Sequence, residues 1–463
     1  MAVAAVVASA TLAYAHATLR RSAPAKGQHL SVAPSEIRLT FTEAVELPLA
    51  RVALDGPNGP VELGALSLAD SGMVLTAPIT GRLVAGSYTV QWQIAGADGH
   101  PVRGEFGFFI APGAAGVAAG SGSVSADPAT HHDPTTFPQS GGFSAESPAY
   151  ALIRWLTFIA VLGVIGAVAF RAVLGIVRWQ ASPAGELLLS PAARGAAGLG
   201  AIMALASLVL AAARLIAQSV ALHGAGSTFD AMLVSTMVMR TIWGSGWIVQ
   251  LVGSLVALAG FWVARRHSAG WPIAAVGALA LGVSPALSGH AASVAQYRPL
   301  PILADTLHVV GASGWLGSLL VMLVVGIPVA LRLEVNRAPA VAALVNAFSP
   351  TALVFAGLTV GTGVLAAWLH LGSVSALWES GYGRTLLLKL AALTGVFATG
   401  AYNWLRVKPT LGQEVATSRL RRSATAEIVV GVLVLAITAV LVASGTPATM
   451  ADGEETTSSP VHP

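Results

Sequence analysis

Hydrophobic positions divide the chain into a short apolar stretch, a region of short alternating segments and a long apolar region. Residues 2–15 are apolar and end in Ala13-Tyr14-Ala15. Such a stretch followed by small residues is typical of a secretory signal and its cleavage site, so we assign residues 1–15 to a signal peptide. Cleavage after Ala15 would make His16 the first residue of the mature protein. An uncleaved N-terminal anchor is the alternative, although the stretch is short for a membrane span.

Alternation of apolar and polar residues predicts strands in residues 16–111. It is clearest in five short segments, at 37–41, 51–54, 73–75, 88–94 and 104–110. Turn-forming Gly, Pro, Asp and Asn separate these segments. Short strands at this spacing, without helical periodicity, favour a small antiparallel β-sandwich. Residues 112–148 are rich in Gly, Ala, Ser and Pro and predict a flexible linker.

Long apolar runs dominate residues 149–446 and predict an all-α membrane domain. Eight runs are long enough to cross a bilayer, at 150–177, 196–222, 241–264, 271–288, 303–331, 350–371, 384–405 and 424–445. Arg and Lys gather in the loops that share one side if the N-terminal region is outside, which is the positive-inside pattern. We therefore expect a multi-pass protein of the cytoplasmic membrane, with the N-terminal domain and a disordered tail at 447–463 both extracytoplasmic.

Composition agrees with a membrane protein and removes several kinds of chemistry. The 463 residues are 55% hydrophobic and only 10% charged, unlike a soluble enzyme. The absence of cysteine excludes disulfides, thiolate metal sites and iron–sulfur clusters. The net charge of +4 is accounted for by residues that flank the spans, so we predict no nucleic-acid partner. No phosphate-binding loop is recognisable, which argues against ATP-driven pumping.

One candidate metal site follows the strand predicted at 88–94. Residues two apart on a strand point to the same face, so Asp98 and His100 reach one ion if the strand continues that far. His16 as a mature N-terminus would add an amine and an imidazole. A set of three nitrogens and one carboxylate oxygen suits Cu(II) by ligand type.

Polar residues within the predicted spans give a second candidate. Asp305 lies three residues before His308, so the two share a helix face. An ionisable residue inside a span is costly and favours a functional interpretation. Other imidazoles and thioethers fall on the same, outer side and could bind copper or simply cap and pack helices; they are His223, His290, His370, Met232, Met237 and Met239.

Three further charged residues lie within the predicted spans. Arg214 and Lys389 could pair with Asp305 and hold the bundle together, or extend to the membrane interface. We favour the pairing. Glu427, near the inner end of the last span, is interpreted as neutralising the arginines that precede it.

Several motifs of the N-terminal region resemble the periplasmic copper-binding CopC family. They are His16 directly after Ala-Tyr-Ala, and the stretches at 22–27, 39–43 and 98–104, the last reading Asp-Gly-His-Pro-Val-Arg-Gly. The resemblance implies a Greek-key β-sandwich that binds one Cu(II) through the amine and imidazole of His16, Asp98 and His100. Glu43 matches a carboxylate that lies near copper in some members. The methionine-rich Cu(I) site of other members is missing, since this domain contains only Met73.

The membrane region resembles the CopD family of copper-transport proteins. The matching stretches are 288–291, 305–317, 383–389 and 421–427. Both resemblances together imply a CopC–CopD fusion, a class linked to copper import and copper handling in bacteria.

The resulting expectation is a non-enzymatic protein of copper resistance and homeostasis. It would capture Cu(II) outside the membrane and pass copper to a transmembrane pathway, with His290, Asp305 and His308 as candidate receivers. The membrane domain also offers ligands for Cu(I). Because Cu(II) and Cu(I) favour different ligands, a copper chaperone or a reductase is an expected partner, besides the copper ion and the lipid bilayer.

Two other functions use the same residues. A terminal histidine with a second histidine is also the copper arrangement of oxidative polysaccharide-cleaving enzymes, but a carboxylate such as Asp98 would occupy a position that oxygen chemistry needs open. The membrane histidines could instead serve as axial ligands in a haem-dependent redox protein. Substrate-dependent peroxide consumption would identify the enzyme, and a visible haem spectrum would identify the electron carrier.

Overall fold

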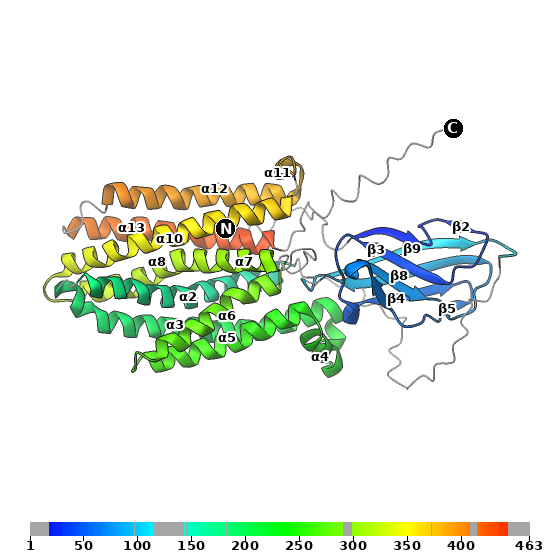
Figure 1. Cartoon of the computed structure of the whole chain (residues 1–463), viewed down its shortest axis with the longest axis horizontal. Coiled ribbons are helices and arrows are strands. Elements are labelled where there is room, and N and C mark those ends of the chain that lie inside the picture. Colours follow the sequence, from blue (N-terminus) through cyan, green and yellow to red (C-terminus); the bar gives the residue numbers. More distant parts are fainter. Residues whose placement is uncertain are drawn as a thin grey trace.

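A computed structural model shows a β-sandwich that lies end to end with a helical bundle (Figure 1). The structure describes residues 18–96, 98–114, 143–144, 147–180, 183–289, 299–371, 373–407 and 414–442. His16 and His290 lie outside the described residues, as do the predicted signal peptide, most of the predicted linker and the C-terminal tail.

The strands of the described residues form two sheets. One sheet has the order β1-β3-β7-β6 and the other has the order β2-β9-β8-β4-β5. The strands are β1 (Leu19–Ala23), β2 (His29–Leu30), β3 (Glu36–Phe41), β4 (Arg51–Gly56), β5 (Gly59–Val61), β6 (Ser67–Ala69), β7 (Val74–Pro78), β8 (Gly86–Ala95) and β9 (Pro101–Ile110). The predicted sandwich is confirmed, and each of the five alternating segments coincides with a strand. The pairing is antiparallel except for the short parallel contact of β2 with β9.

The alternation in β8 explains the core of the sandwich and also marks where the bundle covers it. Tyr88, Val90 and Trp92 alternate with less buried residues and pack between the sheets. The alternation then stops, because Gln93 and Ala95 are buried as well, at 1% and 0% exposure. Because both faces are buried, the end of β8 must also pack against another part of the molecule.

The bundle consists of long helices whose ends extend beyond the apolar runs. Eight helices within the described residues are long and apolar enough to cross a membrane. The elements are α2 (Pro148–Trp179), α3 (Pro183–His223), α4 (Ala231–Met239), α5 (Ile242–Ala264), α6 (Gly270–Leu287), α7 (Pro299–Ala312), η6 (Ser313–Gly317), α8 (Ser318–Val321), η7 (Met322–Gly326), α9 (Ile327–Leu331), α10 (Arg337–Leu371), α11 (Ala376–Glu379), α12 (Gly381–Tyr402), η8 (Asn403–Val407) and α13 (Glu414–Leu441). The predicted spans therefore hold, with α3 and α10 each beginning 13 residues earlier than predicted (183 against 196, 337 against 350).

Small residues bring the helices into close contact. A Cβ added to Gly166 of α2 would lie 2.3 Å from the backbone of Gly317 in η6, and one added to Gly317 would lie 2.3 Å from the Leu162 carbonyl. In lipid, the hydrophobic effect does not drive helices together. Close approach of their backbones stabilises the association through van der Waals contacts instead. η6, η7 and η8 are π-helical turns within otherwise α-helical segments.

Candidate metal centre

The turn between β8 and β9 brings Asp98 and His100 into contact. β8 ends at Ala95 and β9 begins at Pro101, so the strand does not continue to Asp98 as the sequence analysis required. The side chains meet through the turn instead. The His100 backbone N–H donates to Asp98 Oδ1 at 3.0 Å, and His100 Nδ1 lies 2.9 Å from Asp98 Oδ2. Gly99 between them has a φ of 79°, which glycine adopts without strain.

Glu43 approaches the same turn from the loop after β3. A Cβ on Gly96 would lie 3.0 Å from Asp98 Oδ1 and 3.7 Å from Glu43 Oε2, so both carboxylates face one point. The backbone fixes this approach, because the Glu46 N–H donates to the Ala95 carbonyl at 2.8 Å. The structure thus brings together the three described residues predicted for this site.

These donors are buried. Glu43, Asp98 and His100 are 6%, 4% and 7% exposed. Burial of carboxylates and imidazoles is costly unless they are hydrogen-bonded or bind a metal. The Asp98 carboxylate orients the His100 ring, a contact by which carboxylates commonly fix metal-binding histidines. No group of three His, Asp or Glu side chains reaches a single ion within the described part of the chain, so a closed site needs a further ligand.

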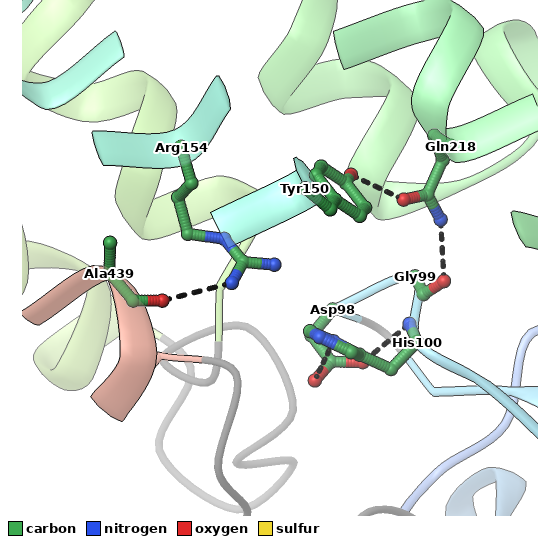
Figure 2. A network of polar contacts seen from close by, with 7 residues as sticks. All are labelled: Asp98, Gly99, His100, Tyr150, Arg154, Gln218 and Ala439. Carbon is green, nitrogen blue, oxygen red and sulfur yellow. Dashed lines mark hydrogen bonds and ion pairs between the residues drawn. The ribbon is translucent and has the colours of Figure 1, made fainter. Parts of the chain in front are cut away.

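The turn rests directly on the bundle (Figure 2). The Gln218 side chain of α3 donates from Nε2 to the Gly99 carbonyl at 2.6 Å and accepts from the Tyr150 hydroxyl of α2 at 2.6 Å. A Cβ on Gly99 would lie 2.8 Å from the Trp243 ring of α5. Only glycine therefore fits between Asp98 and His100 when the two domains are in contact.

Two charged side chains of the sandwich meet helix ends of opposite polarity. Arg103 donates to the Ala221 and Leu222 carbonyls at the C-terminus of α3, at 3.3 and 3.4 Å. Glu46 accepts from the Ile242 N–H at the N-terminus of α5 at 3.0 Å. Cations favour helix C-termini and anions favour N-termini, because unpaired carbonyls and N–H groups gather there. We call these contacts, together with the Gln218–Gly99 bond, the junction.

Burial alters the protonation equilibrium of Arg103 at the junction. It lowers the pKa of Arg103, and the neighbouring charge of Arg51 lowers that pKa further. Gln93 bridges the same region, since it accepts from Arg103 Nε at 2.8 Å and donates to the Leu222 carbonyl at 3.1 Å. This contact explains why alternation fails at the end of β8.

An apolar cluster completes the junction. Leu49 and Ala95 of the sandwich pack with Leu222, Met237, Val238 and Trp243 of the bundle. Met237 is fully buried in this cluster, whereas Met232 and Met239 are 50% and 75% exposed. The structure therefore supports the packing interpretation for Met237.

His308 of the second candidate site faces α10. Its Nδ1 lies 3.0 Å from the Thr359 carbonyl oxygen and 3.3 Å from Thr362 Oγ1. Gly363 leaves room for the ring, because a Cβ there would lie 3.1 Å from His308 Cε1. Asp305, one turn earlier, interacts electrostatically with Lys389 of α12. The two residues share α7 but have partners on different helices.

The remaining predicted residues have structural contacts. Arg214 donates to Gln250 and, at 3.1 Å, to Ser288 Oγ, rather than pairing with Asp305 as predicted. His223 Nδ1 lies 3.3 Å from Ser219 Oγ in the last turn of α3, so its ring contacts a side chain of its own helix. Glu427 is buried and lies 3.4 Å from Asn403 Nδ2, rather than neutralising the preceding arginines. The side chain of His370 lies outside the described residues.

Three family models match successive parts of the chain. They are the CopC domain at 19–111, the N-terminal domain of copper resistance protein D-like proteins at 144–296, and copper resistance protein D at 342–441. The copper transport protein CutJ of Bacillus subtilis is 26% identical over 443 residues, which are 94% of this chain and 75% of CutJ. This chain belongs to the CopC–CopD fusions.

Relatives of the CopC domain alone are also similar. Protein YobA of Escherichia coli K12 is 31% identical over 99 residues, which are 21% of this chain and 80% of YobA. The crystal structure of CopC from Methylosinus trichosporium OB3b is 30% identical and covers 21% of this chain and 95% of that one, with a TM-score of 0.20. The CopC–CopD fusion is a multi-pass membrane protein of the copper resistance and transport families.

Sequence reasoning missed three residues of the bundle. Gln218 and Trp243 contact the turn that holds Asp98 and His100, and Tyr150 bonds to Gln218. A signal for one of them existed. Ser207, Arg214 and Gln218 recur at helical spacing on α3, and all three are buried. A buried polar stripe inside a membrane span implies polar neighbours, but the sequence does not tell which element supplies them.

Proposed function

We propose that this CopC–CopD fusion captures Cu(II) outside the cytoplasmic membrane and passes copper to a transmembrane pathway for import and homeostasis. One observation carries the proposal. The turn that holds Asp98 and His100 is the same turn that contacts the CopD domain through Gly99. A metal-binding turn that lies against a membrane domain suits transfer between the two. The similarity to CutJ, described as a copper transport protein, extends over 94% of this chain and so covers both of its domains.

The capture site comprises His16, Asp98 and His100, with Glu43 beside them. Two carboxylates and imidazole nitrogens form a donor set that suits Cu(II). The chain near His16 is anchored at this place, since the Thr18 N–H donates to Thr42 Oγ1 at 2.9 Å and Thr42 precedes Glu43. His16 lies only two residues before Thr18 in the sequence.

The receiving site comprises His308 and Asp305, with His290 as a further ligand. A carbonyl oxygen only accepts hydrogen bonds, so the Thr359 contact places the proton of a neutral His308 on Nδ1. The lone pair then lies on Nε2, which is the arrangement that a hydrogen bond from Nδ1 to a backbone carbonyl imposes on metal-binding histidines. The carboxylate of Asp305 on the same helix supplies an oxygen ligand or a counter-charge.

The expected orientation favours capture of copper outside the cytoplasmic membrane. Arginine-rich loops at the far end of the bundle favour an exported CopC domain and an extracytoplasmic tail. Passage through the membrane would draw on a gradient, the membrane potential or a partner. Because Cu(II) and Cu(I) prefer different ligands, we expect a reductase or a copper chaperone as a partner.

Cu(II) binding by the isolated CopC domain tests the capture site. The domain 16–114 would be made with His16 as its true first residue and compared with the same domain carrying one additional N-terminal residue. We expect tight binding that the extension abolishes, because the extension removes the free amine beside the imidazole. Equal binding by both forms would remove His16 from the site.

Copper uptake by cells tests the receiving site. His308→Ala should lower uptake strongly while Cu(II) binding by the CopC domain stays unchanged. His267→Ala is the matched control, because this exposed histidine lies beyond α5 at the opposite end of the helix from Trp243. Uptake that is unaffected by His308→Ala would contradict a role of this histidine in the pathway.

A further inference from the structure

A cavity of about 250 Å³ lies within the helical bundle. Its walls come from the span that runs from α7 to α9, from α10, from α12 with η8, and from α13. Most of the lining is apolar or aromatic, and the rings include Trp315 and Phe397, whose centres are 5.1 Å apart. Among the described residues, Asp305 and His308 do not line the cavity, so it is separate from the proposed receiving site.

One carboxylate faces this largely apolar cavity. Glu427 of α13 is 4% exposed, and its Oε2 accepts from Asn403 Nδ2 of η8 at 3.4 Å. The Trp315 side chain is a second hydrogen-bond partner. The other oxygen, Oε1, lies beside Gly400, where a Cβ would be 3.8 Å away. Both partners are uncharged, and no arginine, lysine or histidine of the described residues lines the cavity. The lining therefore does not balance the charge of an ionised Glu427.

A thioether lines the same cavity. Met322 of η7 is 1% exposed and lies seven residues after Trp315. Residues seven apart fall on the same face of a helix, and both of these residues line the cavity. A thioether is a soft ligand that favours Cu(I), and the faces of aromatic rings attract cations. The cavity thus combines a soft ligand, aromatic rings and one carboxylate.

These groups belong to unusual helical turns. Trp315 is part of η6, Met322 of η7 and Asn403 of η8, and all three are π-helical turns. The described residues contain no other π-helical turn. Such turns are rare and frequently occur at functional sites. Their convergence on one cavity favours a binding function over packing alone.

The cavity continues the helix faces that hold His308. His308, Trp315 and Met322 follow one another at intervals of seven residues along the span from α7 to η7. On the facing helix α10, Thr359 contacts His308, and Ala356, three residues earlier, lines the cavity. The same two helix faces therefore lead from the proposed receiving site to the cavity.

We propose that this cavity is a Cu(I) site, in which the Met322 thioether and the Glu427 carboxylate bind the ion beside the Trp315 ring. The inference rests on the proposed function, which makes copper the transported ion. A buried charge in a membrane is costly unless it is paired. One carboxylate neutralises the single charge of Cu(I) but leaves Cu(II) with a net positive charge. The thioether also prefers Cu(I). The ion arrives already reduced, so binding at this site involves no electron transfer.

The experiment is a titration of the full chain in detergent with Cu(I), without oxygen and against a competing Cu(I) chelator. Met322→Leu removes the sulfur and nearly keeps the side-chain volume, and Glu427→Gln removes the charge. We expect each to weaken the binding of one Cu(I) ion per chain by at least about tenfold. Met203→Leu is the matched control, because this partly buried methionine packs against Gly163 of α2, outside the cavity. Glu334→Gln, at an exposed position between α9 and α10, is the control for charge.

X-ray absorption distinguishes a copper ligand from a residue that only packs. The full chain made with selenomethionine and loaded with one equivalent of Cu(I) should show a Cu–Se contact. Met322→Leu should remove this contact, and Met203→Leu should keep it. A Cu–Se contact that survives Met322→Leu would overturn the inference. So would unchanged Cu(I) binding in Met322→Leu and Glu427→Gln, or an equal loss of affinity in Met203→Leu.

Copper uptake by cells tests the proposed function separately. If the unmodified chain supports no uptake while Met322→Leu and Glu427→Gln weaken Cu(I) binding, transport is refuted and the Cu(I) site stands. If His308→Ala abolishes uptake while Cu(I) binding does not respond to the two cavity variants, transport stands and the Cu(I) site is refuted.

Discussion

The proposed capture site of the CopC domain and the proposed receiving site of the CopD domain are built in opposite ways. Asp98 and His100 come from one short turn, and their side chains bond to each other at 2.9 Å. Asp305 and His308 are also close in sequence, three residues apart, yet their partners lie on α12 and α10, 51 residues or more away along the chain. Within a turn, residues that are close in sequence determine the side-chain contacts. On a membrane helix, the adjacent helices determine them.

The two sites also differ in what buries them. His308 is surrounded by helices of its own domain, whereas the capture turn is covered by a different domain through Gln218 and Trp243. Exposure of the receiving site would require the bundle to rearrange. Exposure of the capture site requires only that the junction open, which breaks a few hydrogen bonds and one apolar cluster. Access to the proposed capture site therefore requires a smaller rearrangement than access to the proposed receiving site.

The largest expected effect is the loss of Cu(II) affinity when a proposed copper ligand is removed from the turn. His100→Ala should lower the Cu(II) affinity of the isolated domain by about a hundredfold or more, because it removes a ligand rather than a residue that orients one. His29→Ala is the control, since His29 is exposed on β2 of the same domain. Isothermal titration of both variants measures the effect. A similar loss in both would mean that the copper site lies elsewhere on the domain.

Gly99→Ala should distinguish two reasons why the turn contains glycine, namely its positive φ and its contact with the bundle. In the isolated domain it adds only the strain of a positive φ, about 1–2 kcal/mol of unfolding free energy. In the full chain the new Cβ also meets the Trp243 ring, so the junction should open. Thermal unfolding of the domain measures the first effect. A protein without cysteine accepts spin labels at chosen positions, so a label distance between Val32→Cys and Phe229→Cys measures the second. An unchanged label distance would show that the turn does not touch the bundle.

Glu46→Gln should weaken the junction less than Gly99→Ala. The variant keeps a hydrogen-bond acceptor for the Ile242 N–H but loses the interaction of a negative charge with the N-terminus of α5, about 0.3–1 kcal/mol. The same label pair should report a small increase in the separated form. Glu36→Gln, on β3 away from the bundle, serves as the control. An equal shift in both variants would argue against a specific contact with α5.

Met237→Leu should have the smallest effect. A buried thioether that packs with Leu222 and Trp243 can be replaced by leucine at a cost of less than about 1.5 kcal/mol. Copper uptake should then stay at the level of the unmodified protein. A marked loss of uptake with unchanged stability would restore the interpretation of this methionine as a Cu(I) ligand.

Much of this protein follows from the sequence alone. Period-two alternation identified the strands of the sandwich, because a half-buried strand must alternate. Length and apolar content identified the eight spans, since a bilayer sets both. The Asp98–His100 contact was predictable because the residues are neighbours, although the reason was a turn rather than a strand. Glu43 could be placed only through the family resemblance, because it lies more than 50 residues from Asp98.

The tertiary structure alone decided what lies against the capture turn. Alternation in β8 gave no warning that Gln93 and Ala95 would be buried, since a polar residue at the end of a strand is ordinarily exposed. Nor did the apolar runs show that Tyr150, Gln218 and Arg154 would meet beneath Gly99. Membrane spans are apolar on most faces, so their sequence specifies that they cross the bilayer and leaves their rotation to packing. Contacts between the two domains depend on that rotation of the helices, which only the tertiary structure reveals.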